Sequence, residues 1–113
     1  MRDGDLPSSR PGIIAWPRTA EEVARIVRRC AALGIPIAPF GAGSGVCGGT
    51  LPDARTVLLD LKRLGRMRLT DRSVHAEAGV LGIRLEEDLN ARGFTLGHFP
   101  SSILCSTVGG WVA

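Results

Sequence analysis

The chain has 113 residues, of which 44% are apolar and 22% are charged. This length suits one small domain, and the composition is that of a globular protein. No apolar run is long enough to cross a bilayer, and the N-terminus does not resemble a signal peptide. The sequence therefore predicts a cytoplasmic protein without a transmembrane segment.

The net charge of +3 comes almost wholly from arginine. One short stretch is notably basic and holds Lys62, Arg63, Arg66, Arg68 and Arg72. No aromatic side chain is interleaved with this basic cluster, so it offers bases nothing to stack on. We expect a solvated basic face and no nucleic acid partner.

Cysteine and histidine spacing argues against a metal site. Cys30, Cys47 and Cys105 are odd in number and form no CxxC pair, which also excludes a disulfide framework. His75 and His98 are far apart and lack ligand spacing. Cys30 falls on the apolar face of an expected helix and is predicted to lie in the core.

The first half of the chain predicts a strand–helix–strand unit. Residues 1–11 are expected to form a tail without structure, and residues 12–113 the domain. Residues 12–16 form a short strand, and Thr19-Ala-Glu-Glu22 is a capping box that begins a helix. That helix ends at Gly34, and residues 35–38 form the next strand. The apolar face of the helix holds Val23, Ile26, Val27, Cys30 and Leu33.

The second half predicts further strands and a second helix. Residues 56–61 are a continuous apolar run, typical of a strand buried on both faces. Residues 67–70 and 74–78 flank Asp71-Arg-Ser73 and indicate a hairpin, with Val74 facing the core. The predicted fold class is therefore α+β: a β-α-β unit followed by mixed strands and a second helix.

The second helix is expected at residues 82–92, with its leucines inward and Gly93 as its stop. Its carboxylates, Glu86 to Asp88, are predicted to form a solvated face rather than an acid–base site. We assign no catalytic residue. Residues 110–113 are apolar without a stop signal, which suggests that the sequence is truncated at its C-terminus.

A glycine-dense stretch, Pro39-Phe-Gly-Ala-Gly-Ser-Gly-Val-Cys-Gly-Gly-Thr50, follows the second expected strand. With few side chains and with glycines that tolerate positive φ, its amides can converge on an anion such as a pyrophosphate. The alternative is a flexible connector. The strand-like runs on both sides favour a ligand-binding loop.

Two familiar phosphate-binding loops are excluded. Gly43-Ser-Gly-Val-Cys-Gly48 matches the G-x-G-x-x-G of dinucleotide-binding folds, and Asp60 stands near the position of a ribose-binding acid. However, residues 49–55 are too short, and too broken by Pro52, to form the helix which that fold requires. A Walker A loop is excluded because no Gly-Lys-Ser/Thr is present.

Several segments stand in a recognisable order: Thr19-Ala-Glu-Glu-Val23, the glycine stretch, Val57–Leu61, Ala78-Gly-Val80 and Thr107-Val-Gly-Gly110. In this order the chain from Pro17 to Ala113 resembles the PCMH-type FAD-binding domain of the vanillyl-alcohol-oxidase-like flavoproteins. Within that family, His75–Gly79, Leu96–Pro100 and Cys105–Val112 resemble the alkyldihydroxyacetonephosphate synthases and their bacterial relatives.

The resemblance implies two FAD-binding segments. The first comprises Pro39, Phe40, Gly41, Ala42, Gly43, Ser44 and Gly45, and the second Ser101, Ser102, Ile103, Leu104, Cys105, Ser106 and Thr107. It implies that Ser106 and Thr107 offer hydroxyls and that Gly109-Gly110 allows close approach to the flavin. Because no histidine lies in the loop, FAD is expected to bind non-covalently.

Two departures from the family pattern stand in the loop. Ala42 replaces a frequent glycine, and a positive φ there would cost about 1 kcal/mol. Gly45 lacks a hydroxyl that is often found at its position.

The resemblance implies the FAD-binding portion of a flavin-dependent oxidoreductase, with the small-molecule substrate held by a separate domain. Both a 2-hydroxy-acid oxidase or dehydrogenase and an alkyl-ether-forming synthase fit. The alternative is a truncated remnant or small interaction module that does not bind FAD alone. The sequence does not indicate an oligomeric state.

Overall fold

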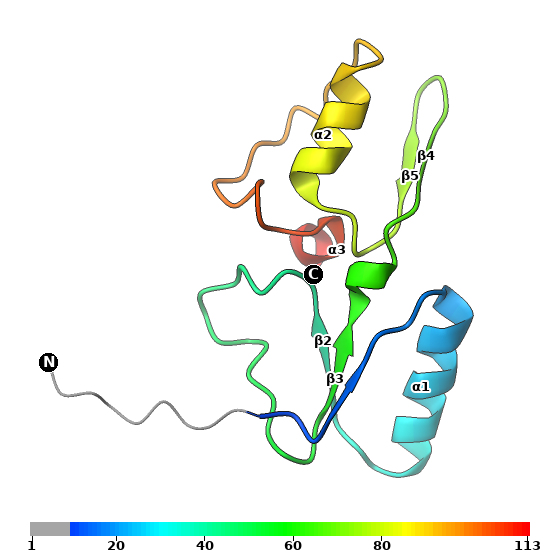
Figure 1. Ribbon diagram of the computed structural model, residues 1–113, viewed down its shortest axis with the longest axis vertical. Coiled ribbons are helices and arrows are strands. Elements are labelled where there is room, and N and C mark those ends of the chain that lie inside the picture. The colour runs from blue at the N-terminus through cyan, green and yellow to red at the C-terminus, as the bar shows by residue number, and fades with distance from the viewer. Residues whose placement is uncertain (1–9) are drawn as a thin grey trace, which may run out of the picture. The chain divides into compact units, whose positions relative to one another are not determined.

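The computed structural model describes residues 10–113. The expected tail at residues 1–11 therefore lies mostly outside the described residues. The described chain forms two compact units, one of residues 10–40 and 45–60, the other of residues 41–44 and 61–113. Helices and strands are mixed, as the α+β prediction states (Figure 1).

The first unit contains a parallel three-stranded sheet. Its strands are β1 (Ile13–Ala15), β2 (Ile37–Phe40) and β3 (Val57–Asp60), in the order β1-β3-β2. Val57 pairs with Ile13 on one side and with Ile37 on the other. Val57 and Leu59 are 5% and 3% exposed, which confirms the prediction of a buried strand.

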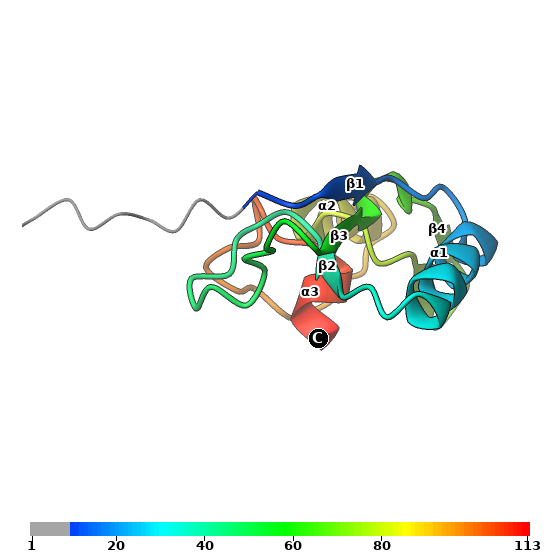
Figure 2. The same ribbon diagram turned by 90° about the horizontal axis from the view of Figure 1, so that it is seen from below.

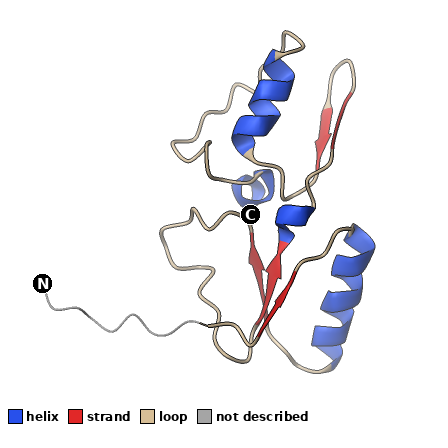
Figure 3. Cartoon of the chain, in the orientation of Figure 1, coloured by secondary structure: helices blue, strands red, loops and turns tan. Residues whose placement is uncertain are grey.

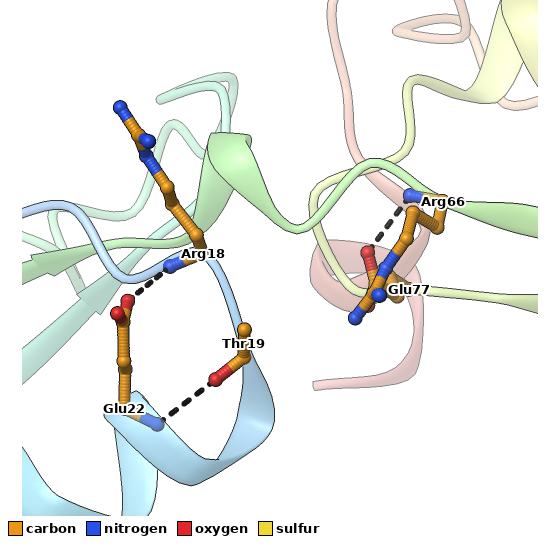
Figure 4. A network of polar contacts seen from close by, with 5 residues as sticks. All are labelled: Arg18, Thr19, Glu22, Arg66 and Glu77. Carbon is orange, nitrogen blue, oxygen red and sulfur yellow. Dashed lines mark hydrogen bonds and ion pairs between the residues drawn. The ribbon is translucent and has the colours of Figure 1, made fainter.

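Helix α1 (Ala20–Ala32) joins β1 to β2 and runs alongside the sheet (Figures 1 and 2). At its start the amide of Glu22 donates to Thr19 Oγ1 at 3.2 Å. The Glu22 carboxylate accepts from the amide of Arg18 at 2.7 Å, one residue earlier than a standard capping box places it (Figure 4). The helix ends before Gly34, whose φ is +64°.

The predicted apolar face of α1 is only partly packed. Cys30 is buried as expected, whereas Val27 and Leu33 are 41% and 53% exposed. The helix has 13 residues and the neighbouring strands have three or four. A helix of that length spans about 20 Å and such strands about 10–13 Å, so the sheet cannot cover the whole helix face.

The second unit contains a hairpin and helix α2 (Gly82–Asn90). Strands β4 (Met67–Leu69) and β5 (Val74–Ala76) pair antiparallel, as predicted. The core consists of Val80, Leu85 and Leu89, and the hairpin packs against it through Met67, Leu69, Val74 and Ala76. Gly93, with φ +78°, follows the helix as expected.

The basic cluster is exposed, as predicted, and its Arg66 forms hydrogen bonds with a carboxylate. Arg66 donates from Nε and Nη2 to Glu77 Oε1 at 2.9 and 2.8 Å, and from its amide to Oε2 at 2.8 Å (Figure 4). These bonds to the Arg66 side chain and amide lower the pKa of Glu77. They hold the start of β4 to the chain just after β5.

The prediction of a fully solvated carboxylate face on α2 is wrong for Glu86, although Glu87 and Asp88 are exposed. Glu86 is 5% exposed. It accepts hydrogen bonds from Thr95 Oγ1 at 2.5 Å and from the amide of Leu96 at 2.9 Å. The Thr95 hydroxyl, and then the Leu96 amide, lower the pKa of this carboxyl. Glu86 thus anchors the irregular segment after α2.

The end of the small-residue segment forms a short helix, α3 (Val108–Val112), which the sequence did not predict. Thr107 caps it, because its Oγ1 accepts from the amide of Gly110 at 3.3 Å. Paired glycines disfavour helix, so this cap and the contacts of the helix override local propensity.

Gly79 gives a test of packing in the second unit. A methyl group there would overlap Leu61 O and lie 2.8 Å from Leu64 O, both backbone atoms. We expect Gly79→Ala to lower the free energy of unfolding by about 2 kcal/mol, measured by urea denaturation. In the control, Gly65→Ala, the nearest atom is 3.9 Å away, and the change should stay within about 0.5 kcal/mol. Equal losses in the two variants would contradict the packing.

Glu86 gives a pH-dependent test. Its folded-state pKa lies below its unfolded value, so it stabilises the fold above pH about 4.3 and loses this effect as pH falls. Glu86→Gln should therefore reduce stability at pH 7 and differ less from wild type near pH 3, measured by denaturation at both. Glu87→Gln, on the exposed face, should change little at either pH. A Glu86→Gln effect independent of pH would refute the assignment.

Candidate functional site

Residues 41–56 connect two parallel strands without a helix (Figure 3). A connection of this kind usually contains a helix, which satisfies its own amides. The absence of a helix in this described stretch confirms that the G-x-G-x-x-G match is not a dinucleotide-binding fold of the helix-dipole type. The donors that this connection offers are therefore loop amides and not a helix N-terminus.

The backbone N–H groups of residues 41–50 have no hydrogen-bond acceptor among residues 10–113. The next amide, of Leu51, donates to Gly48 O at 3.2 Å. Residues 43–50 are exposed. Gly43 and Gly48 have φ of +73° and +72°, a region that other residues enter at a cost. Ala42 has no positive φ, so the strain considered for it does not arise.

The far end of this loop is fixed by a tight turn at Asp53. Its Oδ1 accepts from the amide of Arg55 at 2.9 Å and from Thr56 Oγ1 at 2.8 Å. The Thr56 hydroxyl, followed by the Arg55 amide, lowers the pKa of Asp53. The turn leads directly into β3. Residues 41–50, which precede it, are the part of the loop whose amides lack acceptors among the described residues.

The second predicted segment, residues 101–107, is hydrogen-bonded to the first residues of α2. Turns within it are closed by the Ile103 amide to Pro100 O and by the Cys105 amide to Ser102 O, both at 2.9 Å. The Gly82 amide donates to Ser106 O at 2.9 Å, and the Ile83 amide to Ile103 O at 3.0 Å. The segment is therefore attached to a helix, although it has no regular structure of its own.

The two hydroxyls predicted to face a cofactor make bonds within the protein. Ser106 Oγ donates to Ser102 O and accepts from Trp111 Nε1, each at 2.7 Å. Thr107 Oγ1 caps α3. Both residues are buried, at 4% and 2% exposed, yet their amides donate to no acceptor within residues 10–113. A buried unpaired donor costs about 1–3 kcal/mol, so these amides, rather than the hydroxyls, are the groups of the segment that are left without an acceptor.

The two predicted segments meet at Gly41 and Thr107. A methyl group on Gly41 would overlap Thr107 Oγ1 and lie 3.5 Å from Thr107 Cβ. Only glycine fits this contact, and the start of the loop is thereby held against the residue that ends the second segment.

The remaining predicted residues have varied surroundings. Pro39 and Phe40 are the last residues of β2 rather than part of the loop. In the second segment, Ser101, Leu104 and Cys105 are exposed, while Ser102 and Ile103 are half-buried. Gly109 packs against Ala78, since a methyl group there would lie 2.8 Å from Ala78 O and Cβ. Its small size is thus explained by the protein's own packing.

A hollow of about 600 Å³ lies between the β4–β5 turn and the end of α2. Its lining includes Leu69, Arg72, Val74, Leu89, Arg92 and Leu96. It contains no residue of either predicted segment, and its polar side chains belong to surface turns. It is separate from the candidate site.

Comparison with known proteins identifies the family. The family model described as "FAD binding domain" matches residues 11–113. The chain belongs to this family. FAD is therefore its cofactor. The open loop amides suit the phosphates of such a group, because a main-chain N–H donates to an anion.

Relatives extend the comparison. The chain is 34% identical to an alkyldihydroxyacetonephosphate synthase of Caenorhabditis elegans, over 100% of this chain and 20% of the relative. It is 30% identical to glycolate oxidase subunit GlcD of Bacillus subtilis, over 90% of this chain and 22% of the relative. The chain thus spans about a fifth of the curated relatives it matches.

Solved structures agree on the fold. An alkyldihydroxyacetonephosphate synthase structure has a TM-score of 0.80 at 36% identity, covering 88% of this chain and 21% of that one. A cholesterol oxidase from B. sterolicum has a TM-score of 0.76 at 20% identity, covering 86% and 20%, and supports the fold alone.

Neither a metal centre nor a membrane span is found in the part of the chain that the structure describes. Residues 10–113 contain no cluster of three or more potential metal ligands. No described helix has the length and apolar character needed to cross a bilayer.

The contact between Gly41 and Thr107 predicts that a methyl group at residue 41 weakens FAD binding more than a methyl group at an uncrowded glycine. Gly41→Ala should push the loop from Thr107 and weaken FAD binding about tenfold, or about 1.4 kcal/mol, measured by titration of apoprotein. The control, Gly65→Ala, adds the same methyl group outside both predicted segments, where the nearest atom is 3.9 Å away and φ is not positive. If both variants lost affinity equally, the contact with Thr107 would not be the cause.

Proposed function

We propose that the amides of residues 41–50 form a pyrophosphate loop for FAD and that residues 101–107 flank the flavin. The observation that carries this proposal is the run of amides without protein acceptors, in a chain of the FAD binding domain family. Positive φ at Gly43 and Gly48 supports it, because such residues turn successive amides toward one point.

The proposed loop acts without cationic side chains. Residues 39–50 contain no lysine or arginine. Arg55, which follows, forms an ion pair with Asp53 at 3.2 Å. Main-chain dipoles alone therefore balance the phosphate charge in this proposal, which is consistent with five glycines among residues 41–49.

FAD supplies the redox or adduct chemistry when bound, and the residues described here bind and orient it. The carboxylates with lowered pKa values are already engaged: Asp53 with Thr56, Glu77 with Arg66, and Glu86 with Thr95. Each serves a turn, a hairpin or a loop. We therefore place no catalytic group among them and propose that the substrate is a small molecule bound by a separate domain.

For the whole protein we propose a flavin-dependent enzyme in the cytoplasm. An alkyl-ether-forming synthase is favoured, because relatives with that name match over the full chain at 34% and 35% identity. A 2-hydroxy-acid oxidase or dehydrogenase is the second candidate, supported by GlcD at 30% and by a D-lactate dehydrogenase of Arabidopsis thaliana at 31% identity.

The purified whole protein is expected to be yellow, and acid precipitation should release FAD into the supernatant. Release is expected because residues 39–50 contain no histidine that could carry a covalent link. Flavin retained in the precipitate would contradict non-covalent binding. Colourless protein that cannot be loaded with FAD would instead support the remnant or interaction module.

The two enzyme classes differ in what they do to the flavin. Glycolate or D-lactate added without oxygen should bleach the oxidised flavin of a hydroxy-acid enzyme. The favoured synthase should show no bleaching and should form alkyldihydroxyacetonephosphate. Bleaching by a 2-hydroxy acid without ether product would make the second candidate the correct one.

A further inference from the structure

Trp111 makes a specific hydrogen bond to the second cofactor segment. Its Nε1 donates to Ser106 Oγ at 2.7 Å, and Ser106 Oγ donates onward to Ser102 O, also at 2.7 Å. A serine hydroxyl has one proton, so this pair of bonds fixes its rotation. These two hydrogen bonds connect Trp111 of α3 to Ser106 and, through it, to Ser102.

The indole ring itself is held in place. A methyl group on Gly82, the first residue of α2, would overlap the six-membered ring of Trp111. The ring of His98 meets the indole edge-on, with centroids 5.2 Å apart and planes at 75°. With α2 on one side and His98 in contact, the indole N–H has a defined direction.

We infer that Trp111 is a positioning residue for FAD, acting through Ser106. The inference rests on the proposed function of residues 101–107. Ser106 and Thr107 are the buried residues whose amides lack acceptors within residues 10–113. The bond from Trp111 fixes the Ser106 hydroxyl and restricts the backbone that carries these two amides. Trp111 thereby orders donors for the cofactor without touching it.

The test is a comparison of FAD affinities between matched tryptophan variants of the full protein. Trp111→Phe keeps an aromatic ring but removes the indole N–H together with the outer ring atoms that lie against Gly82. Ser106→Ala, which removes only the acceptor of the hydrogen bond, is therefore measured beside it. We expect an FAD dissociation constant about tenfold higher, the scale of one neutral hydrogen bond, with a changed flavin absorption spectrum. Trp16→Phe is the control: it removes the 3.1 Å bond from Trp16 Nε1 to Asp60 Oδ2 in the first unit and should change neither.

A double-mutant cycle separates positioning from general packing. Ser106→Ala should weaken FAD binding as Trp111→Phe does, and the double variant should lose little more than either. Additive losses, an unchanged dissociation constant in Trp111→Phe, or an equal loss in Trp16→Phe would each overturn the inference. A wild-type protein that binds no FAD would overturn the proposed function itself, and the inference with it.

Discussion

The parallel pairing of β2 with β3 constrains how this chain can be built. The chain must return from the carboxyl end of one strand to the amino end of its neighbour, and it does so over residues 41–56 without a helix. A helix would have satisfied its own amides. The irregular path leaves the amides of residues 41–50 without acceptors among residues 10–113, and the candidate site follows from that deficit.

Helix α2 contacts most of the other segments of the second unit. Its apolar face packs on the hairpin through Leu85 and Leu89. Its first amides hold residues 101–107, and Glu86 anchors Leu96 upstream of them. One short helix thus joins the core to a segment that has no regular structure, so the packing of the core and the position of residues 101–107 are coupled.

Much of the fold could be predicted from local patterns. Alternation at Val74, the run at residues 57–60 and the glycine after each long helix reflect burial periodicity and backbone freedom, which are local properties. The irregular segments could not be predicted, because their structure depends on distant partners. Glu86 reads as a surface carboxylate until the chain brings the Thr95 hydroxyl and the Leu96 amide to it.

In the candidate site, too, the features set by local sequence could be predicted and those set by distant contacts could not. The loop was recognisable because glycine density is a local property, and its segments matched a family in order. The roles of Ser106 and Trp111 were not predictable: a hydroxyl offered to a cofactor and one bonded to an indole have the same sequence. The contact between Gly41 and Thr107 likewise joins positions far apart in the chain.

Both ends of the open loop are pinned, by the glycine contact at residue 41 and by the Asp53 turn. The number of residues between these two fixed points determines how many backbone torsions lose their freedom when an anion binds. Insertions near the exposed Val46 would add freedom at little cost to the native fold, but would make capture of the anion entropically harder. Under the proposed function, the tolerance of this loop to lengthening is limited by recognition of the anion rather than by folding.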